Sequence, residues 1–112
     1  MSSVLDRAKA HFDSGRKGSI DVAEWNCKIH FTRPNLGEHI AFNAENEKDR
    51  KHALVTLVQE RSLDEKGERI FGEGAKVYSE LAGSVDPHIL NRIAQAIMSP
   101  VTEQTQGEIE KN

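Results

Sequence analysis

The stretch SLDEKGERIFGE, residues 62–73, has spacing that resembles a calcium-binding loop. Its sixth residue is Gly67 and its twelfth is Glu73, where an EF-hand loop carries its invariant glycine and its bidentate glutamate. Asp64 also fits a ligand position, but Lys66 stands at another, where its ammonium group would repel the cation. We therefore interpret this stretch as a polar chain reversal in which Gly67 adopts a positive φ.

The histidines and the single cysteine offer little metal or nucleophile chemistry. The five histidines are scattered, and neither an HExxH pattern nor paired cysteines join them. Cys27 and His30 are close in sequence, but residues three apart on a strand face opposite sides and cannot jointly bind a metal. The alternation of Cys27 with Ile29 and Phe31 instead predicts a small core residue.

Carboxylates and glycines give no stronger signal for catalysis. Glu38 with Glu45, or Glu60 with Glu65, could act as acid and base, but nothing in the sequence marks either pair as buried. The run GEGAK lacks the spacing and terminal Ser or Thr of a phosphate-binding loop. We predict that the protein is not an enzyme, holds no metal or cofactor, and acts by binding.

Size and charge restrict the class of protein further. The chain of 112 residues is most simply one domain, which we place at residues 1–100. Its formal net charge of −3 does not favour a nucleic-acid partner. One cysteine suits a reducing cytoplasm, and the sequence predicts neither a secretion signal nor a membrane span.

Apolar periodicity predicts a mainly α (α+β) fold of four to five helices with one small N-terminal antiparallel β-hairpin. Helix starts are expected at Ser3 with Asp6, at Asn35 with Glu38, and at Asp86-Pro87. The hairpin should pair residues 20–22 with 27–31. Trp25 lies in its turn, where it either packs under the hairpin or projects as an anchor for a partner.

Each expected helix has an apolar side. The first carries Val4, Leu5, Ala8 and Phe12, and the second Leu36, Ile40 and Ala44, with Phe42 off that line. Residues 43–51 form either a bend or a continuous exposed helix. The remaining apolar positions are Ala53, Leu54, Leu57 and Val58, then Ala75, Val77, Tyr78 and Leu81, then Ile89, Leu90, Ile93, Ala94 and Ile97. Residues 101–112 are polar and acidic, and we predict a mobile tail there.

The order of these elements resembles the small tail assembly chaperones of long-tailed, siphovirus-like bacteriophages. A tryptophan-containing hairpin ending in Arg-Pro is followed by helices, then by HALVTLVQERSLDEKGERIF, a short helix, DPHILNRIAQAI and a polar tail. The likeness covers about residues 20–100. The residues that carry it most specifically are Trp25, Arg33, Pro34, Asp64, Glu65, Gly67 and Phe71.

This resemblance implies a non-catalytic factor that acts in the host bacterial cytoplasm and is absent from the mature virion. Such chaperones bind the tape measure protein, keep it soluble and help the tail tube protein polymerise around it. They are often made in a short and a longer form by programmed frameshifting, and Glu110-Lys111-Asn112 can be encoded by a slippery run of adenines. Self-association into a ring or spiral is also expected; nucleic acid and membrane are not expected as partners.

Partner contact would use apolar side chains that cover the helix faces of the tape measure protein. Each such residue is equally a candidate for the protein's own core, and an exposed apolar patch would favour partner contact. The candidates are Trp25, Leu36, Ile40, Ile70, Phe71, Val77, Tyr78 and Leu81.

Two other functions remain open from the sequence. One is a structural tail or head–tail connector protein, which would be retained in the virion. The other is a small helical DNA-binding regulator that uses residues 75–98 as a helix-turn-helix. Its second helix offers only Arg92 as a cation, whereas a recognition helix usually presents several groups to DNA.

Overall fold

The computed structural model describes residues 3–99, within which five α-helices and a short 3-10 helix accompany a two-stranded antiparallel sheet. The predicted fold, mainly α with one small N-terminal hairpin, is confirmed. The predicted tail and the frameshift expectation lie outside the described residues. The elements are α1 (Val4–Gly15), β1 (Lys17–Val22), η1 (Ala23–Trp25), β2 (Cys27–Thr32), α2 (Leu36–Lys48), α3 (Arg50–Arg61), α4 (Ala75–Ser84) and α5 (Pro87–Met98).

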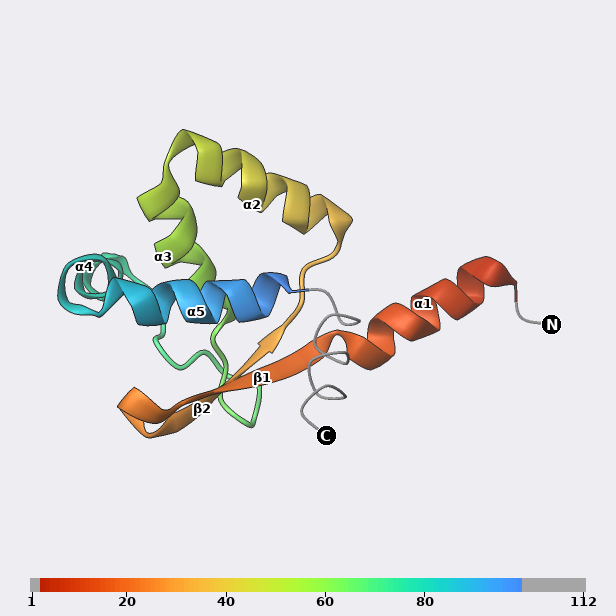
Figure 1. Ribbon diagram of the computed structural model, residues 1–112, viewed down its shortest axis with the longest axis horizontal. Coiled ribbons are helices and arrows are strands. Elements are labelled where there is room, and N and C mark those ends of the chain that lie inside the picture. Colours follow the sequence, from red (N-terminus) through yellow and green to blue (C-terminus); the bar gives the residue numbers. More distant parts are fainter. Residues whose placement is uncertain (1–2, 100–112) are drawn as a thin grey trace.

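Helix α5 lies between the hairpin and α3, and it supplies the centre of the core (Figure 1). Helix α2 packs on α3 at the outer edge, while α1 projects away from the rest of the protein (Figure 1). The main core cluster of buried residues consists of Val22, Ile29, Phe31, Val55, Leu57, Val58, Leu81, Ile89, Leu90, Ile93, Ala94 and Ile97.

The three predicted helix starts are confirmed by their caps. The Ser3 hydroxyl accepts a hydrogen bond from the Asp6 N–H at 3.0 Å, and the Asn35 side chain accepts one from the Glu38 N–H at 2.9 Å. In both boxes the carboxylate accepts from the cap residue's own N–H. Each cap therefore satisfies backbone donors that the first helical turn leaves unpaired. Asp86 caps α5 in the predicted way, with proline at the first turn.

A bend separates α2 from α3, which settles the alternative left open for residues 43–51. Asp49 has extended backbone, with a φ of −152° and a ψ of 90°. Its carboxylate accepts a hydrogen bond from the His52 N–H at 3.1 Å and so caps α3. One residue thus ends one helix and begins the next, which lets α2 fold back along α3.

The hairpin register pairs Lys17 with Thr32 and Val22 with Cys27. The prediction that Cys27 is a small core residue is wrong, because its side chain is exposed. Alternation places Cys27 on the same sheet face as the buried Ile29 and Phe31. Its register partner Val22, on the same face, is fully buried, so the packing that covers this end of the hairpin reaches β1 but leaves the Cys27 side chain exposed.

The reversal after α3 is closed by Asp64, and Gly67 has the predicted positive φ, at 86°. The Asp64 carboxylate accepts hydrogen bonds from the N–H groups of Glu68 and Lys66, at 3.0 and 2.8 Å. These bonds, that from Glu68 foremost, hold the pKa of Asp64 below its usual value. The carboxylate best placed to bind a calcium ion is therefore already bonded to the backbone of the loop. Within residues 3–99, no group of three or more His, Cys, Asp and Glu side chains could hold a metal ion.

An ion pair joins the hairpin turn to α5. The Glu24 carboxylate accepts hydrogen bonds from both terminal nitrogens of Arg92, at 3.0 and 2.6 Å. These bonds, followed by one from Glu24's own backbone N–H, lower the pKa of Glu24 from 4.5 to about 2. Because the folded pKa is depressed, the stability that this pair contributes is present above pH 4.5 and is lost as the pH falls toward about 2.

We expect the Glu24 side-chain carboxyl carbon to titrate with a midpoint near 2 in an NMR pH series. Arg92→Gln removes the donors and should return the midpoint toward 4.5. Arg69→Gln, which breaks a different surface pair with Glu73, should leave the Glu24 midpoint unchanged. A wild-type midpoint above about 4 would contradict the bidentate contact.

Candidate functional site

Helix α2 is turned so that its apolar side faces solvent. Leu36 and Ile40 are 75% and 58% exposed. The small residues Gly37, Ala41 and Ala44 are also exposed, and we call these five residues the α2 ridge. Surface helices ordinarily direct their apolar stripe at the core, so a ridge turned outward is typical of a surface that binds another molecule.

The opposite side of α2 faces the protein and is largely polar. Its half-buried residues recur at helical spacing and are Glu38, His39, Phe42, Glu45 and Asn46. Phe42 alone contributes a large apolar side chain, which packs against the core. The helix buries none of its residues fully. Its orientation must therefore be fixed by polar contacts as well as by apolar packing.

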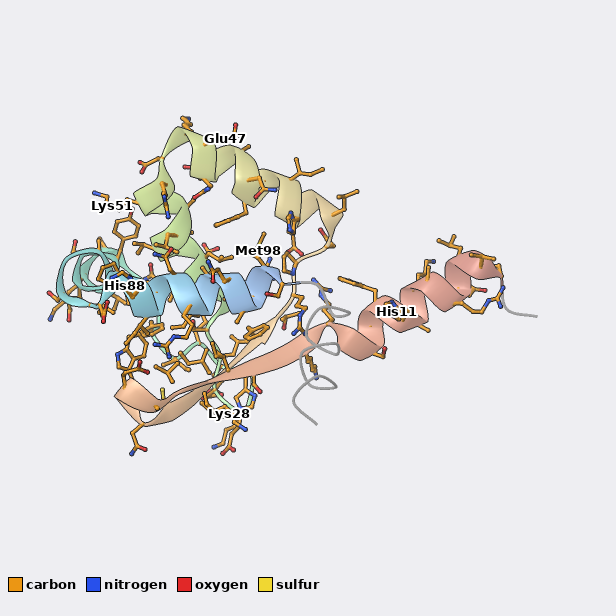
Figure 2. The ribbon with its side chains drawn as sticks, viewed as in Figure 1. His11, Lys28, Glu47, Lys51, His88 and Met98 are labelled. Carbon is orange, nitrogen blue, oxygen red and sulfur yellow. The ribbon has the colours of Figure 1, made fainter. Side chains whose placement is uncertain are left out.

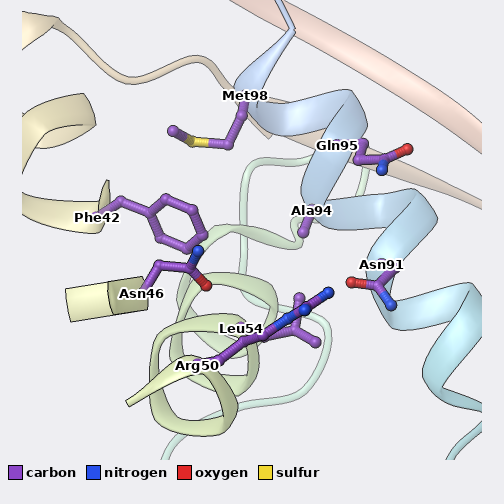
Figure 3. Close-up of a pocket in the computed structure, with 8 residues that line it drawn as sticks. All are labelled: Phe42, Asn46, Arg50, Leu54, Asn91, Ala94, Gln95 and Met98. Carbon is purple, nitrogen blue, oxygen red and sulfur yellow. The ribbon is translucent and has the colours of Figure 1, made fainter. Parts of the chain in front are cut away.

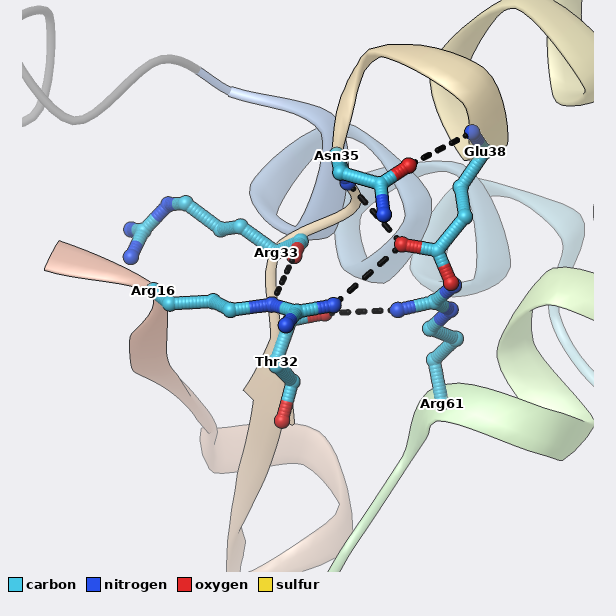
Figure 4. Close-up of polar contacts among 6 residues, drawn as sticks. All are labelled: Arg16, Thr32, Arg33, Asn35, Glu38 and Arg61. Atoms are coloured by element: carbon cyan, nitrogen blue, oxygen red, sulfur yellow. Dashed lines mark hydrogen bonds and ion pairs between the residues drawn. The ribbon is translucent and has the colours of Figure 1, made fainter. Parts of the chain in front are cut away.

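A polar network around Glu38 supplies those contacts (Figure 4). The Glu38 carboxylate accepts hydrogen bonds from Arg61 at 2.6 Å and from Arg16 at 3.3 Å. It also accepts one from the Asn35 N–H at 2.9 Å. The Asn35 bond foremost, then the bond from Arg61 and the positive charges of Arg61 and Arg16, lowers the pKa of Glu38 against the opposing effect of burial. Since Glu38 is held on the inner side of α2, Leu36 and Ile40 are left on the outer side.

The same two arginines connect α2 to the end of β2. Arg16 Nε donates to the Arg33 carbonyl at 3.0 Å, and Arg61 donates to the Thr32 carbonyl at 3.2 Å (Figure 4). The network therefore brings together four ends of elements that are distant in sequence. These are the start of β1, the end of β2, the start of α2 and the end of α3. The network positions the α2 ridge relative to the core.

Arg33 is buried and joins three segments of the backbone. Its guanidinium donates to the carbonyls of Gly15 at 2.7 Å, Ser99 at 3.1 Å and Lys17 at 3.3 Å. It also lies 5.3 Å from the centre of the Phe31 ring. A Cβ at Gly18 would lie 2.8 Å from this guanidinium and 2.7 Å from the ring, so only glycine fits there. We call this arrangement the Arg33 clamp.

Sequence analysis singled out Arg33 only as part of the resemblance and missed the clamp. One signal was available. The alternation that buries Ile29 and Phe31 continues to Arg33 and places it on the inner face of the sheet. An arginine is seldom fully buried without partners, and those partners could not be found from sequence because they are backbone carbonyls of distant segments.

The eight predicted partner-binding residues fall into three groups. Leu36, Ile40 and Ile70 are exposed, while Leu81 is 2% exposed and belongs to the core. Leu81 therefore offers no side chain to a partner in this conformation. The other four are half-buried and pack against the core: Trp25, Phe71, Val77 and Tyr78. Of the three exposed residues, Leu36 and Ile40 share α2, while Ile70 lies apart from them in the reversal.

Trp25 packs under the hairpin, the first of its two alternatives. Its ring meets that of Phe71 edge to face, with the ring centres 6.3 Å apart and an angle of 86°. Such pairs contribute about 0.5–1.5 kcal/mol beyond their area burial. Tyr78 is similarly engaged, because its hydroxyl lies 3.0 Å from His52 Nδ1. These aromatic side chains therefore support the fold on the side of the hairpin turn and α4.

Two hollows are lined by Phe42 of α2. The first, which we call the acidic groove, lies between α2 and α3 and encloses about 290 Å³. Ala41, Phe42, Ala53 and Leu57 give it an apolar lining, and its carboxylates are those of Glu38, Glu45 and Glu60. The second, of about 190 Å³, lies between α2, α3 and α5 (Figure 3). There Phe42 and Met98 face one another across the opening, and Arg50 is the charged residue (Figure 3).

Helix α1 carries a further exposed apolar surface that was not among the predicted contact residues. Val4 and Leu5 are 73% and 63% exposed, and α1 buries no residue. Only Phe12 on its apolar side is half-buried, beside the Arg16 guanidinium at 5.2 Å from its ring centre. Figure 2 shows the side chains of this helix, His11 among them, standing out around the projecting ribbon.

No family model, curated protein or solved structure matches this chain. Among residues 3–99, no helix combines the length and the apolar character needed to cross a bilayer.

Proposed function

We propose that the protein is a tail assembly chaperone of a long-tailed bacteriophage. It binds the tape measure protein, keeps it soluble and promotes polymerisation of the tail tube protein around it. It does so in the host bacterial cytoplasm and is absent from the mature virion. The observation that supports this function best is the α2 ridge, since Leu36 and Ile40 remain exposed on a helix whose polar side faces the protein.

The ridge has the properties needed to hold an apolar helix reversibly. Leu36 and Ile40 supply apolar area, and Gly37, Ala41 and Ala44 let another helix approach closely. Covering two such side chains is worth about 2–4 kcal/mol in total, which alone gives a weak contact. Many copies along one long chain bind it strongly together, while each copy still dissociates easily as the tube advances.

Co-expression tests this function. The tape measure protein of the same phage is expected to accumulate in the soluble fraction when both proteins are made, and in the pellet when it is made alone. The reason is that the ridge covers apolar helix faces that would otherwise aggregate. Quantitative immunoblotting of both fractions measures the effect. Equal solubility with and without this chain would overturn the proposal.

The alternative functions find less support. A connector retained in the virion would appear in mass spectra of purified particles, where a chaperone should be missing. In the DNA-binding alternative, α5 would be the recognition helix and Arg92 its cation for DNA contact. The Arg92 guanidinium is, however, already bonded to both carboxylate oxygens of Glu24. The apolar side of α5 is buried in the core, so this helix presents a surface poorly suited to a DNA groove.

A further inference from the structure

We propose that copies of this protein associate head to tail, with α1 of one copy lying in the acidic groove of the next. This contact gives the self-association of a tail assembly chaperone a specific surface and rests on that part of the proposed function. It leaves Leu36 and Ile40 of the α2 ridge free, because neither side chain lines the groove; Ala41, at the border, belongs to both surfaces.

Helix α1 lacks the tertiary support that a helix of its length needs. It has 12 residues, projects from the domain and buries none of them (Figure 1). Isolated helices shorter than about 12–15 residues are marginal in water, and most helical stability in proteins comes from packing of an apolar face. The α1 face that would be packed comprises Val4, Leu5, Ala8 and Phe12.

The charged residues beside the apolar face of α1 indicate what kind of surface would cover that face. At 3.6 residues per turn, Arg7 and His11 border the apolar face of α1 on one side and Lys9 borders it on the other. Asp6 lies on the far side of the helix, and Asp13 lies next to Lys9, about as far from the centre of the apolar face as Arg7. A complementary site for α1 therefore has an apolar floor and carboxylates at its edges.

The acidic groove has that pattern. Its lining is apolar at Ala53 and Leu57, and carboxylates stand on both helices that form it, Glu45 on α2 and Glu60 on α3. Glu60 is exposed, and Glu45 lies 4.0 Å from His52. Arg61, the cation of this groove, is already paired with Glu38 at 2.6 Å. The hollow between α2, α3 and α5 instead carries Arg50, which would repel the cations of α1 (Figure 3).

The base of α1 is held in place, so the helix does not reach the acidic groove of its own copy and would bind that of another. The Arg33 clamp holds the carbonyls of Gly15 and Lys17, on either side of the junction between α1 and β1. From that junction α1 points away from α2 and α3 (Figure 1). Because the helix and the groove are different surfaces, the contact is heterologous and repeats from copy to copy, as in a ring or an open spiral.

Sedimentation velocity of the full chain tests this contact. One helix in one groove makes an interface below the standard size, so we expect association that increases between about 10 µM and 1 mM. Val4→Asp with Leu5→Asp should keep the protein monomeric over this range. Ala10→Asp, on the opposite side of the same helix, is the matched control and should associate like the wild type.

A mixing experiment separates a head-to-tail contact from a symmetric one. Glu45→Lys with Glu60→Lys makes the groove repel α1, and this variant alone should also be monomeric. This groove variant is then mixed in equal amounts with the Val4→Asp, Leu5→Asp variant. The groove variant keeps an intact α1, and the α1 variant keeps an intact groove. We expect the mixture to form dimers and nothing larger. Each mixed dimer uses the one intact α1 and the one intact groove, so no intact surface is left to bind a third copy.

Three results would overturn the proposal: a wild type that stays monomeric throughout the range, an α1 variant that associates like the wild type, or a groove variant that does so. Circular dichroism should show the wild-type helix signal for each variant at low concentration. Soluble tape measure protein is measured with the same variants. If self-association fails while the wild-type chain still solubilises that protein, the head-to-tail contact is wrong and the chaperone function stands.

Discussion

Replacing Arg33 by alanine is expected to lower the thermal unfolding midpoint by about 12–20 °C. The substitution removes charged hydrogen bonds to the carbonyls of Gly15, Lys17 and Ser99. Hydrogen bonds to charged groups contribute about 1.5–3 kcal/mol each, and buried acceptors left without donors add a penalty. A loss of about 3 kcal/mol is therefore a conservative total, and differential scanning calorimetry measures it.

Two further variants make the result specific. Arg33→Lys keeps the charge but not the planar fork, so it should restore less than half of the lost stability. Arg69→Ala removes an exposed arginine that pairs with Glu73, and it should change stability by no more than about 0.5 kcal/mol. If Arg33→Ala unfolds within about 2 °C of the wild type, the clamp does not hold these segments together.

Replacing Leu36 and Ile40 together by aspartate is expected to reduce the soluble tape measure protein at least about tenfold. Each substitution removes apolar area worth about 1–2 kcal/mol on contact and adds a carboxylate that binding would desolvate. Because many copies bind one chain, a loss at each contact is multiplied along its length. Quantitative immunoblotting of the soluble fraction measures the effect.

The fold should survive this double substitution, because both side chains are largely exposed. A matched control places two aspartates on the exposed side of α4, at Ser79 and Ala82. That control should solubilise the tape measure protein as well as the wild type does. Equal activity of the ridge variant and the control would show that partner binding occurs elsewhere on the protein.

Signals local in sequence predicted much of the fold. Capping residues such as Ser3 and Asn35 act within one helical turn, so their neighbours identify them. Gly67 was assigned correctly because a tight reversal needs a positive φ that few other residues tolerate. The buried face of α5 followed from a strong helical repeat.

The orientation of surfaces could not be predicted in the same way. Periodicity shows which residues share a side of a helix or strand, but not what covers that side. For α2 the answer depends on Glu38 meeting Arg16 and Arg61, which are 22 and 23 positions away in sequence. Cys27 illustrates the same gap, since alternation gave its face but not the extent of the cover.

The candidate site was therefore predicted in part. Leu36 and Ile40 were named from the sequence and lie together on an exposed ridge, whereas Leu81, named on the same grounds, is in the core. Both patterns are apolar residues at helical spacing. What distinguishes them is tertiary packing, which also left Val4 and Leu5 uncovered on α1.

The Arg33 clamp has a consequence for the head-to-tail contact that we propose. By binding the carbonyls of Gly15 and Ser99 with one guanidinium, it brings the close of α5 beside the root of α1. Ser99 therefore lies beside the base of the helix that, in the contact we propose, enters the next copy.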